Sequence, residues 1–306
     1  MERTESVPVS AAGPQNITSA HDRISIVLAL LALYFIWGST YLMMRQAIQS
    51  FPPFIMAGIR FVVAGAILYT IMRVRGQPAP TLKQWGGSAL IGTLMLVGSN
   101  GSVSFAEQWV ASGIAAVALA AVPLWTALFI GLLGRWPSRI EWIGLGLGFV
   151  GVILLNLENG LWANPQGAIA LLLAPICWGI GSALSPRFSM PSGFMSSATQ
   201  MLCGGAVLFL LAVLSGQRMH AMPTVSAIWA IIYLIVAGSL IAFSAYIYLL
   251  RRVRPALATS YAYVNPIVAV ALGALVAGER ITPIGLAAMF VILTGVGLVS
   301  LRRKHS

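Results

Sequence analysis

Long apolar runs recur along the whole chain and restrict what it can fold into. About 20 helical residues are needed to cross a bilayer core that is about 30 Å thick. Runs of this length are bounded by charge, proline or polar turns, and each predicts a membrane-spanning helix. The ten predicted spans are residues 24–44, 53–72, 85–105, 112–133, 140–157, 167–184, 194–214, 227–250, 256–277 and 283–301.

The composition supports an all-α polytopic membrane protein. The chain is 58% hydrophobic and 8% charged, whereas soluble domains carry about 25% charged residues. A net charge of +11 raises nucleic acid as a partner, but a nucleic-acid binder gathers Lys and Arg on one face. Here the charges lie between apolar runs, so the lipid bilayer is the expected partner. Cys177 and Cys203 lie within apolar runs and are interpreted as structural thiols, and no cofactor or metal is predicted.

The positive residues predict the orientation of the chain. Fourteen of the 18 Lys and Arg residues fall on one side of the predicted spans, three fall on the other, and Arg60 lies inside a span. Because positive residues are retained in the cytoplasm, both termini are expected there, in agreement with an even number of spans. Residues 1–23 are predicted to be a disordered cytoplasmic tail rather than a signal peptide, and residues 302–306 a basic cytoplasmic tail.

The two parts of the chain repeat each other. Trp37 aligns with Trp178 at an offset of 141 residues, and Pro123 aligns with Pro266 at an offset of 143. Each unit has five spans, so the second must start from the opposite face of the membrane. Such inverted repeats are typical of secondary transporters, with the substrate site near the midplane where the units meet. The predicted units are residues 24–157 and 166–301.

Trp37 and Trp178 are predicted to lie deep in the membrane. By the helical rise, Trp37 is roughly 20 Å from the cytoplasmic face and Trp178 roughly 17 Å from the outer face. They are therefore expected on opposite sides of the midplane, too deep for the interfacial aromatic belt. Two interpretations remain open: each closes a central cavity towards its own side, or each is bulky packing between helices.

Several motifs carry a family resemblance. They are "IWGSTY" at 36–41, "PPFIMAGIRF" at 52–61, "SYAYVNPIVAVALGALVAGERIT" at 260–282, and a basic C-terminal tail. With them the chain resembles the drug/metabolite transporter superfamily, EamA family, and its bacterial drug/metabolite exporters, over residues 24–301. The resemblance implies export of small metabolites or toxic compounds across the bacterial inner membrane. One departure is "GRWPSR" at 134–139, which leaves Glu279 without an acidic counterpart in the first unit.

Arg60 and Glu107 are the charged candidates for transport. A charge at the bilayer centre costs about 2.5 to 3.5 kcal/mol. Arg60 is interpreted either as a structural or snorkelling cation, or as a cation that meets a substrate carboxylate. Glu107 shares one helix face with Asn100 and Ser104 and is expected at the outer rim. It is predicted to pair with Arg60 and to relay protons, with an ordinary helix-end glutamate as the alternative.

Prolines within spans predict a polar cavity. Pro266 and Pro123 each free a carbonyl one turn earlier, at Ala262 and Leu119, and broken helices line cavities in transporters. We expect a nearly neutral aromatic cavity between spans 1, 3, 4, 6, 8 and 9, suited to amphipathic, aromatic or amino-acid-like compounds. For any single aromatic residue, helix packing is the alternative. The predicted substrate-binding residues are Tyr34, Trp37, Tyr41, Asn100, Ser104, Trp125, Trp178, Tyr246, Tyr261, Tyr263 and Asn265.

Small residues mark a packing face in the fifth span. Gly144, Gly148 and Gly151 have the spacing that permits close helix approach. This face is expected to join the two units or to form a homodimer contact.

Other function classes fit the residues less well. An intramembrane hydrolase needs a buried Ser-His pair, two aspartates or metal ligands. The three histidines, His21, His220 and His305, fall in predicted loops or tails, so an enzyme is not expected. A secondary transporter working by alternating access is predicted, with a passive facilitator or an uptake carrier of the same fold as the alternative.

Overall fold

The structure is a computed structural model that describes residues 20–110, 112–156 and 165–277, together with eight single positions between Pro283 and Leu298. Every regular element in these residues is helical, as the all-α prediction requires. The elements of the first part are α1 (Ala20–Ala32), η1 (Leu33–Trp37), α2 (Gly38–Ile48), α3 (Pro53–Val74), α4 (Leu82–Gly92), η2 (Thr93–Gly101), α5 (Ser102–Ala106), α6 (Ser112–Leu119), α7 (Val122–Leu132) and α8 (Arg139–Asn156).

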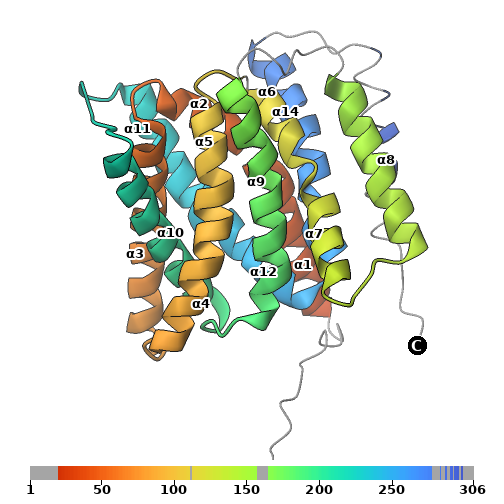
Figure 1. The fold of residues 1–306 in the computed structure, drawn as a ribbon, viewed down its shortest axis with the longest axis horizontal. Coiled ribbons are helices and arrows are strands. Elements are labelled where there is room, and N and C mark those ends of the chain that lie inside the picture. Colours follow the sequence, from red (N-terminus) through yellow and green to blue (C-terminus); the bar gives the residue numbers. More distant parts are fainter. Residues whose placement is uncertain are drawn as a thin grey trace, which may run out of the picture.

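The second part has the same kind of architecture, and the helices of both parts form one bundle (Figure 1). Its elements are α9 (Pro165–Leu184), η3 (Ser185–Arg187), α10 (Gly193–Leu214), α11 (Val225–Tyr233), η4 (Leu234–Phe243), α12 (Ser244–Arg252), α13 (Pro255–Ala258) and α14 (Tyr261–Ala277).

Six helical segments of the described residues are long and apolar enough to cross a membrane. They correspond to predicted spans 1, 2, 3, 6, 7 and 8, and they make the chain a polytopic membrane protein. The first begins before the predicted start, because α1 already includes Asp22. Predicted span 10 lies outside the continuously described residues, as do Glu279 and residues 1–19.

The fourth and ninth predicted spans are each divided into two helices. α6 ends at Leu119 and α7 begins at Val122, with Pro123 in its first turn. The carbonyl of Leu119 therefore lies at a helix end, not inside one continuous helix as predicted. In the ninth span, α13 precedes α14, and Pro266 lies inside α14.

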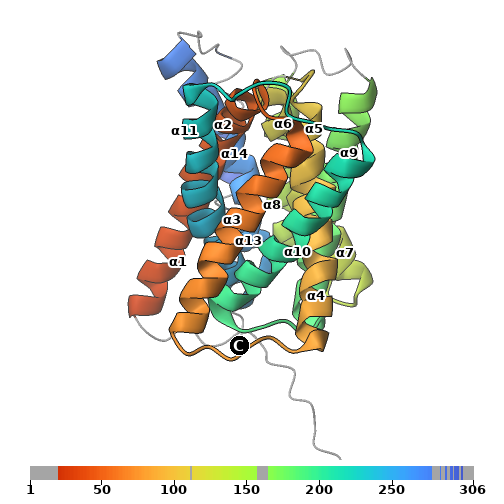
Figure 2. The same ribbon diagram turned by 90° about the vertical axis from the view of Figure 1, so that its left-hand side faces the viewer.

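The first helices of the two parts start at opposite ends of the bundle. In Figures 1 and 2, α1 starts at the lower end and α9 at the upper end. Helix α3, which has Arg73 in its last turn, and helix α12, which ends at Arg252, both finish at the lower end. The positive-inside rule therefore predicts that this end faces the cytoplasm.

Helices α3 and α10 pack together with reciprocal contacts. Each has 22 residues, and at an offset of 140 residues Gly65 aligns with Gly205 and Val62 with Leu202. A Cβ atom on Gly65 would lie 2.9 Å from the backbone nitrogen of Leu202, and one on Gly205 would lie 2.9 Å from that of Val62. Gly65 thus meets Leu202, and the equivalents of these two residues, Gly205 and Val62, also meet. Such a reciprocal contact is the signature of a two-fold relation.

The glycine-rich face of α8 is covered from within the chain. A Cβ atom on Gly295 would lie 2.7 Å from the carbonyl oxygen of Gly144, and one on Gly148 would meet the ring of Tyr263 at 2.9 Å. This glycine face was interpreted either as a contact between the two parts of the chain or as a homodimer contact. The first of these contacts is present. The homodimer stays a prediction.

Three π-helical segments widen the helices near the middle of the bundle. They are η1, η2 and η4, and the last two start at Thr93 and Leu234, which are 141 residues apart. π-helical turns are frequent at functional sites. These segments contribute Trp37, Asn100 and Ser239 to the site described next.

Candidate functional site

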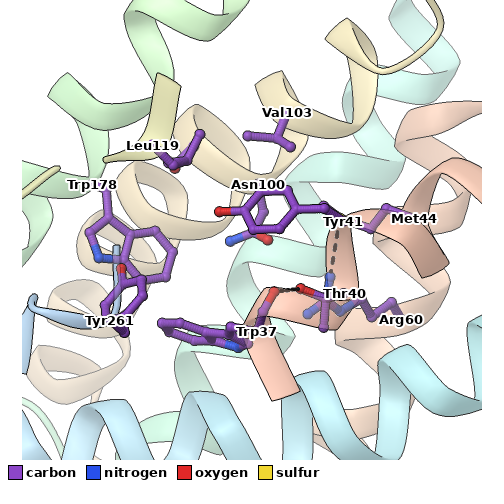
Figure 3. A pocket seen from close by; sticks show the side chains of 11 residues that line it. Trp37, Thr40, Tyr41, Met44, Arg60, Asn100, Val103, Leu119, Trp178 and Tyr261 are labelled. Carbon is purple, nitrogen blue, oxygen red and sulfur yellow. Dashed lines mark hydrogen bonds between the residues drawn. The ribbon is translucent and has the colours of Figure 1, made fainter. Parts of the chain in front are cut away.

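A pocket opens where elements of both parts of the chain meet. Its cavity volume is about 40 Å³, below the roughly 300 to 1,000 Å³ of small-molecule sites, so a small-molecule ligand fits only when the lining residues move apart. Figure 3 shows aromatic side chains on one side of the pocket and Arg60 on the other. The lining residues are Trp37, Thr40, Tyr41, Met44, Arg60, Ser99, Asn100, Val103, Leu119, Trp178 and Tyr261.

Four aromatic rings pack against one another along one wall. The centroid of the Trp37 ring lies 5.4 Å from that of Trp178 and 4.7 Å from that of Tyr261, both edge-to-face. The ring of Tyr246 stands behind them, 5.3 Å from Trp178 and 5.6 Å from Tyr261. Because such ring pairs fix one another's orientation, the wall is a rigid apolar surface.

Hydrogen bonds hold both tryptophans in place. Trp37 Nε1 donates to the carbonyl oxygen of Gly238 at 3.0 Å, which joins η1 to η4. Trp178 Nε1 donates to the hydroxyl of Tyr246 at 3.0 Å, and that hydroxyl also bonds Ser182 Oγ at 2.7 Å. Each indole N–H is therefore satisfied by the second part of the chain.

Arg60 is the charged group of the pocket and is only 3% exposed. Its Nε donates to Ser239 Oγ at 2.8 Å, and Nη1 donates to Met44 Sδ at 3.5 Å. Its guanidinium carbon also lies 4.8 Å from the centroid of the Phe61 ring. The side chain is thus positioned by neutral groups from three helices.

Glu107 follows α5 and is buried rather than at an exposed rim, with 3% of its surface exposed. Neither carboxylate oxygen has a hydrogen-bond partner in the part of the chain that the structure describes. The predicted Arg60–Glu107 ion pair is wrong, because the Arg60 guanidinium is directed to Ser239 and Met44. Arg60 and Arg45 still act on Glu107 electrostatically from a longer distance.

Five of the predicted substrate-binding residues line the pocket together. They come from four predicted spans, which are the first, third, sixth and ninth. They are Trp37, Tyr41, Asn100, Trp178 and Tyr261.

Three predicted substrate-binding residues lie behind the pocket wall instead. Tyr246 supports Trp178 as described, Ser104 donates to Met44 Sδ at 3.7 Å, and the Tyr34 hydroxyl bonds Ser260 Oγ at 2.8 Å. Tyr34 turns away because the π-helical segment η1 changes the register of the first span, so that the predicted Tyr34–Trp37–Tyr41 stripe does not face one side.

The other three predicted residues are not part of the pocket lining and make ring contacts or hydrogen bonds. Trp125 stacks on Phe129 with ring centroids 5.9 Å apart, and the Tyr263 hydroxyl donates to the carbonyl oxygen of Leu145 at 3.2 Å. Asn265, with its amide nitrogen turned towards η1, donates to the carbonyl oxygens of Leu33 and Tyr34 at 3.3 and 3.2 Å. It therefore ties α14 to the first span.

Sequence reasoning missed five lining residues. Thr40 and Met44 follow Trp37 at i+3 and i+7 and so share its helix face, which an extension of the stripe towards the C-terminus would have found. Ser99 accompanies Asn100 in η2 and has no separate signal. Val103 is an ordinary apolar residue that no pattern distinguishes. Leu119 was singled out for its carbonyl, one turn before Pro123, but not as a lining side chain.

Comparison with known proteins places this architecture among transporters. The sequence pattern of the EamA-like transporter family matches residues 24–157 and 165–301. The inner membrane transporter YedA of Escherichia coli strain K12 is 46% identical over 274 residues, which cover 89% of this chain and 90% of that protein. Protein PecM of Dickeya dadantii is 25% identical over 279 residues, covering 88% and 92%.

A solved crystal structure shares the fold. It superimposes with a TM-score of 0.74 at 20% identity, over 90% of this chain and 98% of that one. It shows the fold alone, whereas the sequence relatives confirm the motif-based resemblance to the EamA family.

Proposed function

We propose, from the premise that this chain belongs to the EamA-like transporter family, that it exports small amphipathic, aromatic or amino-acid-like molecules from the cytoplasm by alternating access. The chain is a multi-pass protein of the inner membrane, as its relatives are. Relatives named as transporters favour this function over an enzymatic one.

The pocket is the observation that carries the proposal. Trp37 and Arg60 reach it from the first part of the chain, whereas Trp178 and Tyr261 reach it from the second. A site shared by two parts can be exposed to one side of the membrane or the other when those parts rock against each other. A binding site within one part would not change sides in this way.

An inverted repeat of ten spans is part of the same proposal. Its two units are residues 24–157 and 166–301, and both termini are cytoplasmic. The two separate matches to the family pattern support it. The opposite starting ends of α1 and α9 and the reciprocal glycines of α3 and α10 support it as well.

In this proposal the lining residues Trp37, Tyr41, Asn100, Trp178 and Tyr261 contact the substrate. The residues behind them keep their rings in position. Glu107 is the proposed proton-coupling residue, with Arg60 as the cation that acts on it. Its buried carboxylate lacks hydrogen bonds among the described residues, so a change in its protonation alters the local charge strongly.

Counterflow in proteoliposomes tests the proposal. Vesicles are loaded with an unlabelled compound, and uptake of its labelled form is measured for a panel of amino acids, nucleosides and aromatic toxicants. At least one class is expected to show accelerated exchange, which Trp178→Ala lowers strongly. Trp125→Ala is the matched control, because this tryptophan packs against Phe129 and is not part of the pocket lining.

The same assay separates the alternatives. A passive channel-like facilitator shows flux without accelerated exchange, and an uptake carrier accumulates the compound in right-side-out vesicles. If no compound exchanges, or if both tryptophan variants behave alike, the pocket is not the transport site.

A further inference from the structure

Arg60 brings an unbalanced positive charge to the pocket wall. The other lining residues are aromatic, apolar or neutral polar. Among the described residues, no carboxylate lies within ion-pair distance of its guanidinium, since the ion pairs there join Asp22 to Arg252 and Glu141 to Arg254. Buried charges in proteins are normally paired, so this one calls for an anion.

The hydrogen-bonding capacity of Arg60 is only partly used. A guanidinium has five N–H donors. Ser239 Oγ accepts one, and the other partner is the thioether sulfur of Met44, which is a weak acceptor. Nη2 has no acceptor within the described chain. It lies against Gly238, where a Cβ atom would be 2.8 Å away, so the absence of a side chain leaves it room.

Glu107 does not supply the missing partner. It acts on Arg60 electrostatically, but it is not part of the pocket lining, and its oxygens accept no hydrogen bond from the described residues. Arg45 and Arg60 both act on this single carboxylate. Arg45, Arg60 and Glu107 together therefore carry one positive charge in excess, next to the pocket.

We propose that the pocket binds organic anions, in which an aromatic or apolar body packs on Trp37, Trp178 and Tyr261 while a carboxylate or similar acidic group bonds Arg60. The idea rests on the proposed function insofar as the pocket is the transport site. Charge-assisted bonds between guanidinium and carboxylate are short and strong. In a water-poor pocket, one such bond orients the whole ligand.

Amines are the rival ligand class. Aromatic walls attract cations, and the Trp37–Trp178–Tyr261 wall offers such faces. An amine in this pocket is repelled by Arg60, and the one nearby acid does not line the cavity. The charge of the wall thus favours the anion.

Three probes of equal size test the preference: phenylacetate, phenylacetamide and phenethylammonium, titrated by calorimetry into the full-length protein in nanodiscs. Phenylacetate is expected to bind about tenfold or more tightly than the other two, the gain that a hydrogen bond to a charged group implies. Equal binding of all three, a preference for the amine, or no saturable binding of phenylacetate overturns the proposal.

Substitutions test whether Arg60 causes the preference for phenylacetate. Arg60→Gln is expected to remove the advantage of phenylacetate over phenylacetamide, and Arg60→Lys to keep part of it. Gln200→Ala is the matched control, because Gln200 is the residue of α10 that aligns with Arg60 at the 140-residue offset. A preference for phenylacetate that survives in Arg60→Gln, or that disappears in Gln200→Ala, contradicts the proposal.

The two proposals fail separately. If neutral compounds exchange in counterflow but phenylacetate has no advantage in binding, the transporter stands and the anion preference falls. If phenylacetate binds through Arg60 but nothing exchanges, the anion site stands and the transport function falls.

Discussion

Arg60 in α3 and Gln200 in α10 occupy equivalent places in two helices that pack with two-fold reciprocity, yet their surroundings differ. Arg60 lines the pocket and bonds Ser239 of η4. Gln200 is fully buried; its Nε2 donates to Ser196 Oγ of its own helix at 3.1 Å, and its Oε1 has no partner within the described residues.

The two helices are therefore alike in their backbone packing but differ in the polar side chains that they carry. Backbone contacts such as those of Gly65 and Gly205 follow the two-fold relation closely. The polar side chains do not, since only the α3 side carries a charge into the pocket. Under the proposed function, the reciprocal packing permits both facing states; under the proposed anion binding, the asymmetric side chains give the pocket its ligand preference.

The largest effect is expected from breaking the reciprocal packing. Gly65→Ala and Gly205→Ala each place a Cβ atom 2.9 Å from a backbone nitrogen of the opposite helix. Overpacking of this kind costs about 1 to 3 kcal/mol, and similar losses in both variants are expected from thermal unfolding in detergent.

Gly86→Ala is the control for these two variants, because a Cβ atom on Gly86 has no neighbour within 4 Å. If all three variants unfold at the same temperature, close packing does not hold α3 and α10 together.

The next largest effect is expected from Glu107, the acid on which Arg60 acts. If protons enter through Glu107 as substrate leaves, export accelerates when the external pH falls. Glu107→Gln cannot exchange a proton and is expected to show no such acceleration. The groups that act on or are influenced by Glu107 are Arg45, Arg60 and Tyr41. Export measured against external pH in vesicles checks this, and an unchanged profile would remove Glu107 from the coupling mechanism.

A smaller effect is expected from Ser239→Ala, which removes the oxygen acceptor of Arg60 Nε. A hydrogen bond of this kind contributes about 1 kcal/mol, which is about fivefold in an equilibrium constant. Phenylacetate affinity should weaken by about that factor while phenylacetamide affinity stays the same. Equal weakening of both would mean that the substitution disturbs the whole pocket.

The smallest effect is expected from a substitution in α10, the helix that carries the neutral Gln200. Ser197 Oγ is buried without a hydrogen-bond partner among the described residues. Ser197→Ala removes an unsatisfied group, so stability should change by less than about 1 kcal/mol or increase slightly. A marked loss of stability in thermal unfolding would reveal a polar partner for this hydroxyl.

Much of the fold follows from the sequence, because the bilayer leaves few alternatives. Only helices satisfy the backbone within lipid, so apolar run lengths predict spans well, and six are present with nearly the expected bounds. The ends are less predictable: Asp22 continues the first helix into the predicted tail, where it forms a 3.3 Å ion pair with Arg252. That long-range contact has no local signal.

The site was predictable only in part, for a related reason. Trp37 and Trp178 stand out by their repetition and depth. Tyr34 was misplaced because no local pattern reveals where a helix changes to π-helical turns. The partners of Arg60 were missed because Met44 and Ser239 come from distant parts of the sequence.

The wide turns of η2 have a consequence for everything that follows them in the third span. Each residue of an α-helix advances the rotation by about 100°. If residues Thr93 to Gly101 wound as regular α-helix instead, each would advance the rotation by the full α-helical step, and α5 would swing around its axis. The Glu107 carboxylate would then point towards a different neighbour, so the loose winding of η2 fixes the angular alignment of the acid with the two arginines.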